Sequence, residues 1–502
     1  LKMKKIITKT AKSLITISLL IFFASCNKDR SGVDISAEPD GQTTDTETPT
    51  TYAEINDWIL ENMQIYYLWN TDIPSVTDKT QYPSDYFESL LHRDDRFSWI
   101  QEDYIKLINS LSGVNTESGY DFNLLLMRDL HNVIGYITYI KPGTPAAAAG
   151  LKRGEYFHQI NGTQITIDNY QSLIDKTAER HTLGISVIAD GSITGVNSVT
   201  LDVIENYAEN PVLLDTVYSI GGNKIAYLVY NFFARDNGDG SLEYEKQLNS
   251  IFGKFQSEQI DRLIIDLRYN SGGAVVTTEA LASMISGQST NSIFYTENYN
   301  DYLNTALRRE YGPNYNKAYF IDKIEKYDGN NSVTESIPIN AISGLSTVYF
   351  IVSGRSASAS ELLINGLKPY MEVILVGDTT YGKNVASITI YEDDPVRQQT
   401  NTWGMQPIIV KMANSAGYSD YGNGFAPDRE AYEYDTDTIK QLGDTEELLL
   451  ATTISIITGE SMAGITAATK STGIGRSTTR NIGSSIDRTP VRKNQFISLK
   501  NR

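Results

Sequence analysis

The chain has 502 residues, of which 40% are apolar and 10% aromatic, enough for about two or three globular domains. Its formal net charge of −18 at pH 7 argues against nucleic-acid binding by the body of the protein. Because it has a single cysteine, an internal disulfide is excluded.

The N-terminus combines a basic stretch with a short apolar run. KMKKIITKTAK precedes SLITISLLIFF, whose 11 residues fall short of the roughly 20 that a membrane-spanning helix needs. The run ends in FASC at Cys26, which resembles a bacterial lipobox. Residues 1–26 are therefore expected to be a lipoprotein signal peptide. Lipid on Cys26 would anchor the protein to the cell envelope, in the outer membrane facing the periplasm or the surface; a chance cysteine beside an ordinary signal peptide is the alternative.

Two segments of biased composition flank the expected folded region. Residues 27–52 lack a hydrophobic period and are rich in Thr, Asp, Gly and Pro, which indicates a disordered tether. Residues 461–502 carry eight Lys or Arg and one Asp among many Ser, Thr and Gly. We expect a disordered basic tail, open to contact with anionic lipid or polysaccharide.

Residues 53–112 are expected to form a small helical domain. Apolar residues in YAEINDWILENMQIYYLWN recur at a spacing of three to four, which predicts an amphipathic helix. SDYFESLLHRDDRFSWI, residues 84–100, predicts a second helix with Ser84 as its N-cap. Trp58, Trp69 and Trp99 are interpreted as core residues, with a binding platform as the alternative.

In residues 113–206, sequence patterns typical of strands alternate with patterns typical of turns, and an Ala-rich stretch predicts a short helix. GYITYIKPGTPAAAAGLKRGEYFHQINGTQI closely resembles a PDZ domain in its Pro-Ala-x-x-Ala-Gly-Leu run through Leu151, in Gly154 and in Ile160-Asn161-Gly162. PDZ domains bind a peptide as an added strand and hold its terminal carboxylate on backbone N–H groups.

The corresponding peptide-binding loop is expected at Gly119, Tyr120, Asp121 and Phe122. Asp121 replaces the glycine that is usual there, and its charge would repel a terminal carboxylate. Capture of a free C-terminus is therefore in question, and a role as lid or spacer is the alternative.

Residues 207–460 alternate strands and helices. KIAYLVYNFF, IDRLIIDLRYN, STVYFIV and MEVILVGD predict strands, and SELLINGLK predicts a helix between the last two. This pattern predicts a layered α/β core. DTEELLLATTISII is the expected closing helix, capped at Asp444.

The stretch RSASASE, Arg355 to Glu361, allows several interpretations. Ser358-x-x-Glu361 before an apolar run is a capping box. Gly377 to Lys383 spells G-x-x-x-x-G-K, but Asn384 lacks the hydroxyl that holds magnesium in a phosphate loop. No other motif requires a metal or cofactor, and none is expected.

A third interpretation makes Ser358 a nucleophile, which needs a base. The four histidines all precede the α/β segment: His92, His131, His158 and His181. Lys383 is the remaining candidate. Keeping it neutral near pH 7 takes a pKa shift of ~3.4 units, or ~4.6 kcal/mol, which burial can supply.

Three motifs of this segment resemble the carboxyl-terminal processing (tail-specific) serine proteases. They are DLRYNSGG, the Ser-Ala-Ser-Ala-Ser-Glu run, and Val-Gly-Asp followed by Tyr-Gly-Lys. The resemblance covers about residues 113–460. It implies a crotonase-like (ClpP-type) catalytic core and a dyad of Ser358 with Lys383, 25 residues further on.

The resemblance also implies an oxyanion hole and supporting residues. Gly272, Gly273 and the N–H of Ala359 would stabilise the oxyanion. Glu361 would orient the lysine or cap the helix. Some members carry a glutamine four residues after the lysine, where this chain has Ser387.

The expected function is a lipid-anchored serine endopeptidase that cleaves unfolded or C-terminally exposed polypeptides. The alternatives are a catalytically silent peptide-binding lipoprotein of the PDZ type and a serine hydrolase of small esters or amides. Substrate identity and oligomeric state are left open by the sequence.

Overall fold

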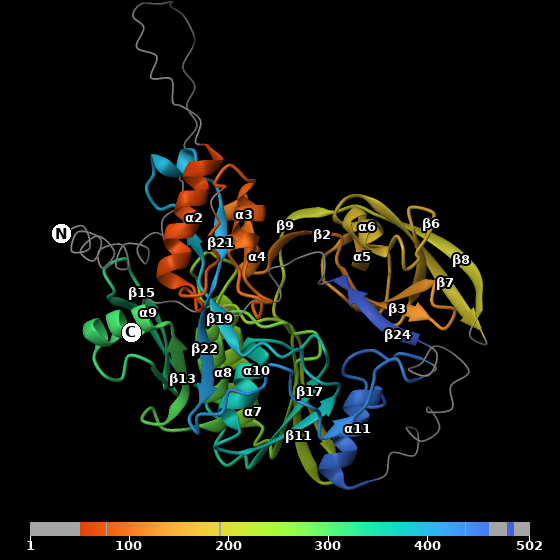
Figure 1. Cartoon of the computed structure of the whole chain (residues 1–502). Helices are drawn as coiled ribbons and strands as arrows, with labels where there is room; N and C mark the ends of the chain where they lie inside the picture. Colours follow the sequence, from red (N-terminus) through yellow and green to blue (C-terminus); the bar gives the residue numbers. More distant parts are fainter. Residues whose placement is uncertain (1–50, 77, 190–191, 437, 461–478, 486–502) are drawn as a thin grey trace, which may run out of the picture.

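The computed structural model describes residues 51–460, except 77, 190, 191 and 437, together with residues 479–485. An N-terminal helical part, a β-rich part and a central α/β part follow one another along the chain (Figure 1). Cys26 and the whole of the expected signal peptide lie outside the described residues, as does the expected tether except for residues 51 and 52. Among the described helices, none is both long and apolar enough to cross a bilayer.

The N-terminal part packs against the central part and shares its apolar core. Its elements are α2 (Tyr52–Tyr66), α3 (Pro83–Ser89), β1 (Trp99–Gln101) and α4 (Tyr104–Leu111). α2 buries Ile55, Ile59 and Met63, as the spacing of its apolar residues predicts. Trp58 and Trp69 pack against the same core, which agrees with their interpretation as core residues.

The second predicted helix is shorter than expected, and the prediction of Ser84 as its N-cap is wrong. α3 begins at Pro83, with Tyr82 as N-cap, because proline suits the first helical position. The helix ends at Ser89. Further on, the carboxylate of Asp95 accepts the N–H groups of Phe97 and Ser98, which fixes a turn where the sequence predicted helix.

The β-rich part is a sheet with an apolar core of its own. Strand order is β24-β3-β4-β5-β7-β8, with β6 paired to β5. The elements before the tail are β3 (Tyr120–Met127), β4 (Val133–Ile140), α5 (Pro145–Ala148), β5 (Tyr156–Ile160), β6 (Thr163–Gln164), α6 (Tyr170–Asp175), β7 (His181–Ala189) and β8 (Ser192–Leu201). β2 (Val114–Glu117) and β9 (Ile204–Ala208) pair where the chain enters and leaves this sheet.

The central sheet has six strands in the order β10-β11-β12-β17-β18-β23. All neighbours are parallel except β10 and β11. The strands are β10 (Val212–Ile220), β11 (Asn223–Tyr230), β12 (Arg262–Asp266), β17 (Thr347–Val352), β18 (Glu372–Gly377) and β23 (Arg429–Glu430).

Helices cover both faces of this sheet. α7 (Glu243–Ser257), α8 (Val275–Ser286) and α10 (Ala359–Leu367) share a core with Leu263 and Ile265. α11 (Leu448–Thr458) packs on Ile264 from the other face. Side chains alternate between faces along a strand, so both faces of β12 are buried, as expected for a parallel sheet.

A second sheet and smaller elements pack around the central part. The sheet has the order β14-β13-β22-β19. The remaining elements are β13 (Ile293–Tyr299), α9 (Asp301–Tyr311), β14 (Lys317–Tyr319), β15 (Lys323–Tyr327), β16 (Val333–Pro338), β19 (Val385–Ser387), β20 (Ile390–Tyr391), β21 (Gly404–Gln406) and β22 (Ile408–Asn414). The predicted layered α/β core with PDZ-like and N-terminal helical parts is confirmed.

Two expectations at the C-terminal end are wrong in detail. α11 is capped by Glu447, whose side chain accepts the N–H of Leu450, and not by Asp444. Part of the tail that was expected to be disordered forms β24 (Thr479–Ser484), which pairs with β3. The composition of the tail did not predict this strand, because the strand is stabilised by its pairing with the edge strand β3.

Replacing Leu248 by alanine tests the central core. Leu248 lies on α7 and is fully buried, so we expect Leu248→Ala to lower the free energy of unfolding by about 2–5 kcal/mol. Ile105 on α4 is 55% exposed, and Ile105→Ala should change the free energy of unfolding by less than about 0.5 kcal/mol. Chemical denaturation measures both. Equal effects of the two substitutions would contradict the assigned core.

Candidate active site

Ser358 lies between β17 and α10, in a turn that two other serines hold in place. Ser356 Oγ donates to the carbonyl of Leu267 at 2.7 Å, and Ser360 Oγ donates to the carbonyl of Asn270 at 3.0 Å. Ser356 and Ser360 thus bind the turn to the segment after β12. The alternation of Ser and Ala in RSASASE therefore has a structural reason on either side of Ser358.

The backbone of Ser358 is strained. Its φ of 64° and ψ of −113° are unusual for a residue with a side chain. Such conformations cost about 1–3 kcal/mol and are found mostly at functional sites. Ser358 is fully buried, and its backbone N–H donates to Glu361 Oε2 at 2.9 Å. The residue stands at the N-terminus of α10, where the helix dipole favours negative charge.

Lys383 follows the glycine turn after β18 and is also fully buried. Burial lowers the pKa of its ammonium group from 10.5 to about 7, although the charges of Asp95 and Glu361 oppose the shift. Its Nζ lies 5.1 Å from the centre of the Phe97 ring. A lysine in these surroundings is substantially neutral near pH 7 and can accept a proton.

Glu361 joins the segments that carry Ser358 and Lys383. Its Oε2 accepts the backbone N–H of Ser358 and that of Lys383, the latter at 2.8 Å. Its Oε1 accepts the hydroxyl of Thr380 and, at 2.7 Å, the N–H of Gly382. Burial raises the pKa of Glu361 above its ordinary value, while these four hydrogen bonds act in the opposite direction. The carboxyl group thus fixes the main chain of both segments.

Gly272 (φ 109°) lies against the Ser358 turn, and Gly273 (φ 135°) lies against the backbone of Phe233. A Cβ on Gly272 would come within 2.7 Å of Ser358 Cβ and 3.1 Å of the Ala359 nitrogen. The N–H of Gly272 donates to Asn270 Oδ1 at 2.9 Å, so in this conformation it is not available to an oxyanion, contrary to the prediction. Glycine at position 272 is required by the close approach.

The N-terminal part completes the surroundings of Lys383, which the sequence did not predict. Arg96 Nη2 donates to the carbonyls of Gly382 and Gly422 at 2.8 and 2.9 Å, and Phe97 lies over the lysine. These residues are almost 300 positions from Lys383 in the chain, so no local pattern connects them.

Ser387 also has an unexpected neighbour. Its Oγ donates to Oε1 of Gln406 on β21 at 2.6 Å, and the amide of Gln406 donates to Thr389 Oγ1 at 2.6 Å. Ser387 and Gln406 are fully buried. The sequence has no glutamine four residues after Lys383, but the fold brings one to Ser387 from a different strand.

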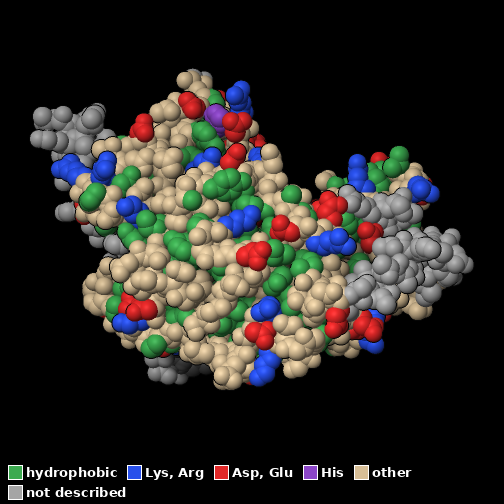
Figure 2. Space-filling model, turned by 90° about the horizontal axis from the view of Figure 1, so that it is seen from below, with side chains coloured by type: hydrophobic (Ala, Val, Ile, Leu, Met, Phe, Trp, Pro, Cys, Tyr) green, Lys and Arg blue, Asp and Glu red, His purple; other side chains and the backbone are tan. Residues whose placement is uncertain are grey.

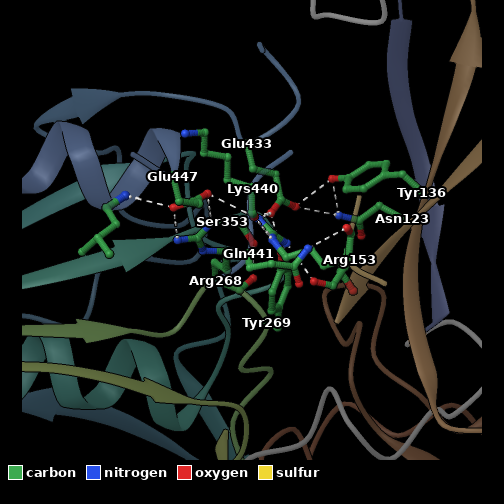
Figure 3. A network of polar contacts seen from close by, with 12 residues as sticks. Asn123, Tyr136, Arg153, Arg268, Tyr269, Ser353, Glu433, Lys440, Gln441 and Glu447 are labelled. Carbon is green, nitrogen blue, oxygen red and sulfur yellow. Dashed lines mark hydrogen bonds and ion pairs between the residues drawn. The ribbon is translucent and has the colours of Figure 1, made fainter. Parts of the chain in front are cut away.

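Arginines and carboxylates link the β-rich part to the central part (Figure 3). Arg153 donates to Glu433 at 2.8 Å and to the hydroxyl of Tyr269, and Arg268 donates to Glu447 at 2.6 Å. Burial alone would raise the pKa of Glu433, but the nearby arginines lower it to about 2. Arg268 belongs to the DLRYNSGG segment, so this network fixes the β-rich part relative to the turn at Gly272.

The predicted peptide-binding loop lies at the start of β3. The side chains of Tyr120 and Phe122 are fully buried in the core of the β-rich part, so a ligand would meet mainly their backbone. Asp121 is 2% exposed, and its Oδ2 lies 3.9 Å from Nη2 of Arg355, next to the serine turn. Gly119 has a φ of 95° and lies close against Thr144.

The surface in Figure 2 carries Lys and Arg side chains interspersed with Asp and Glu, without a continuous basic patch among the described residues on this face. The described residues also include no group of three or more His, Cys, Asp or Glu arranged to hold a metal ion.

Comparison with known proteins identifies the class and then the family. Residues 224–430 match the model of peptidase family S41, residues 54–99 its N-terminal domain and residues 136–185 a PDZ domain. The fold and these matches define a serine protease, a hydrolase that acts on polypeptides. The chain belongs to peptidase family S41.

Individual relatives agree with this assignment. A carboxyl-terminal-processing protease of Picosynechococcus sp. is 26% identical over 342 residues, covering 64% of this chain and 70% of that protein. The carboxy-terminal processing protease CtpB of Bacillus subtilis is 26% identical over 283 residues, covering 55% of this chain and 48% of that protein. A solved structure assigned to the S41 proteases of Bacteroides fragilis has a TM-score of 0.62 at 26% identity, covering 80% of this chain and 97% of that one.

Gly272→Ala tests the close approach of the glycine turn to Ser358. The added Cβ would collide with Ser358 Cβ, so we expect proteolytic kcat/KM to fall at least about a hundredfold, comparable to the loss of an oxyanion donor. Gly222→Ala is the matched control, because Gly222 also has positive φ (77°) but no atom within 4 Å of an added Cβ. Similar losses in both variants would show that backbone strain alone explains the effect.

Proposed function

We propose that the chain is a cell-envelope endopeptidase that cleaves peptide bonds with Ser358 as nucleophile and Lys383 as base. The observation that carries this proposal is the fully buried Lys383, with its pKa lowered to about 7, bound through Glu361 to the segment of Ser358. The strained backbone of Ser358 and its place at a helix N-terminus support it further.

The reaction follows from these groups. Neutral Lys383 takes the hydroxyl proton of Ser358 as Oγ forms a bond to the substrate carbonyl carbon. The N–H groups of Gly273 and Ala359 are the proposed donors to the oxyanion, since Gly272 donates to Asn270. The lysine ammonium then returns the proton to the leaving amine as the C–N bond breaks, and water hydrolyses the acyl-enzyme.

The pH dependence has a defined direction. Because the acting form of Lys383 is neutral, kcat/KM should rise with pH through an inflection near the folded pKa of about 7. Phe97→Ala admits water beside the amine and weakens its desolvation, so the inflection should move to higher pH, toward 10.5. The matched control Tyr52→Ala alters an aromatic residue of the same part that is 47% exposed, and it should leave the inflection unchanged. A profile without an inflection between about pH 6 and 8 would contradict the role of Lys383.

Loss of the nucleophile should abolish cleavage. Ser358→Ala and Lys383→Ala are each expected to lower kcat at least about a thousandfold. Ser332→Ala, in an exposed turn between β15 and β16, should not lower it. Mass spectrometry of the products from an unfolded polypeptide measures all three variants. Unchanged products from Ser358→Ala would show that Ser358 is not the nucleophile, whereas absence of products from the wild type would favour the silent peptide-binding lipoprotein.

Lipid anchoring is proposed from the sequence around Cys26. In a bacterial host that processes lipoproteins, the wild type should incorporate labelled palmitate and sediment with membranes, whereas Cys26→Ser should do neither. Incorporation by the variant would show that Cys26 is not the acceptor.

A further inference from the structure

The edge of the PDZ-like sheet is covered by a segment of the same chain. β24 pairs antiparallel with β3, from Thr479 opposite Met127 to Ser484 opposite Asn123. Figure 1 shows β24 beside β3, on the side of this sheet that faces the central part. β24 therefore occupies the position at which a PDZ domain would bind a peptide as an added strand.

The direction and seating of this segment are those of a peptide ligand. It runs toward the Gly119 loop, where the N–H of Phe122 donates to Ser485 Oγ at 3.3 Å. Ile482 packs against the apolar core of the PDZ-like sheet, and Ser484 and Ser485 are only 5% and 3% exposed. Backbone pairing at an edge, with side chains packed beside it, is the mode in which PDZ domains take peptides.

The start of β3 favours an internal segment over a free C-terminus. Asp121 is buried there and pairs with Arg355 at 3.9 Å, so a second carboxylate would be repelled by Asp121 and would compete with it for the same guanidinium group. An internal segment brings no such charge. Residues 479–485 are internal, because the sequence continues beyond Ser485.

β24 also borders a cavity next to the serine turn. The cavity, of about 380 Å³, is lined by residues 481–484 and by Ser353, Arg355 and Ala357. The Arg355 side chain is 10% exposed, and its Nε and Nη2 have no hydrogen-bond partner among the described residues, although Nη2 forms the long ion pair of 3.9 Å with Asp121 Oδ2. Buried donors without acceptors are costly, and backbone carbonyls of a polypeptide are suitable acceptors.

We propose that the edge of β3, with Arg355 beside it, binds internal extended polypeptide segments, and that residues 479–485 occupy this site as an intramolecular competitor of the substrate. The kinetic consequence rests on the proposed protease function, whereas the binding itself needs no cleavage. Displacement of β24 uncovers β3 together with the cavity beside the turn that carries Ser358.

A binding experiment in the full chain tests the site. Ser358→Ala is used as the parent, and Ile482→Glu is added to release β24, because a carboxylate is costly in an apolar core. Ile193→Glu, at a 40% exposed residue of β8 on the opposite end of the sheet, is the matched control. The probe is a fluorescent peptide with the sequence RSTTRNIGSSID of residues 476–487.

The peptide should bind the Ile482→Glu protein at least tenfold more tightly than the parent or the control, as measured by fluorescence anisotropy. Equal binding to all three proteins, or binding to none, would overturn the proposal. Circular dichroism establishes that the variant is folded, and Ile482→Ser replaces it if it is not.

A kinetic experiment tests the competition. In protein that retains Ser358, Ile482→Glu should lower KM for an unfolded polypeptide at least threefold with kcat unchanged, and the added peptide should raise KM again. An unchanged KM would overturn the role as competitor. Absence of cleavage by the wild type would contradict the proposed function, while the anisotropy result would still decide the binding site.

Discussion

The proposed catalytic mechanism depends on the burial of one amine. Lys383 has no exposed surface, and the loss of hydration lowers its pKa to about 7 against the attraction of two carboxylates. A buried charge is costly, so the neutral form becomes accessible without a histidine. The surroundings that exclude water come from Phe97 of the N-terminal part and from the glycine turn of the central part.

Glu361 holds the segment of the buried lysine next to the segment of Ser358. One carboxyl group accepts hydrogen bonds from the backbones of Ser358, Gly382 and Lys383, so the helix start and the lysine loop have a fixed relative position. The capping-box interpretation and the catalytic interpretation of RSASASE are therefore compatible. The same side chain caps α10 and positions the lysine segment.

The network of arginines and carboxylates fixes the position of the PDZ-like sheet relative to the central part. Arg153, Arg268 and Arg355 surround the ring of Tyr269 at 5.8, 6.0 and 5.3 Å from its centre. Buried ion pairs of this kind add little net stability, but removal of one partner leaves an unpaired charge and is strongly destabilising. The network therefore favours one arrangement of the two parts, in which β3 and β24 lie next to the serine turn.

The sequence predicted the features that depend on local pattern. The α2 helix, the buried strands and the layered core follow from the spacing of apolar residues, and the motifs around Ser358, Lys383 and Gly272 were found by resemblance. The start of α3 at Pro83 and the N-cap of α11 at Glu447 were missed, because several nearby residues compete as caps.

Contacts between distant segments were also missed. Phe97 over Lys383, Gln406 at Ser387 and β24 on β3 depend on tertiary proximity, which no single-sequence periodicity encodes. The expectation of disorder for the tail failed at residues 479–484 for the same reason, since the stabilising edge lies more than 350 residues away.

The most direct test of the central claim is an NMR titration of the Lys383 side chain. With lysine labelled at Cε and Nζ, and Lys383→Arg used to assign the resonance, the shift should titrate with a midpoint near pH 7. A midpoint near the ordinary value of 10.5 would show that the amine is protonated at neutral pH and would contradict its role as base.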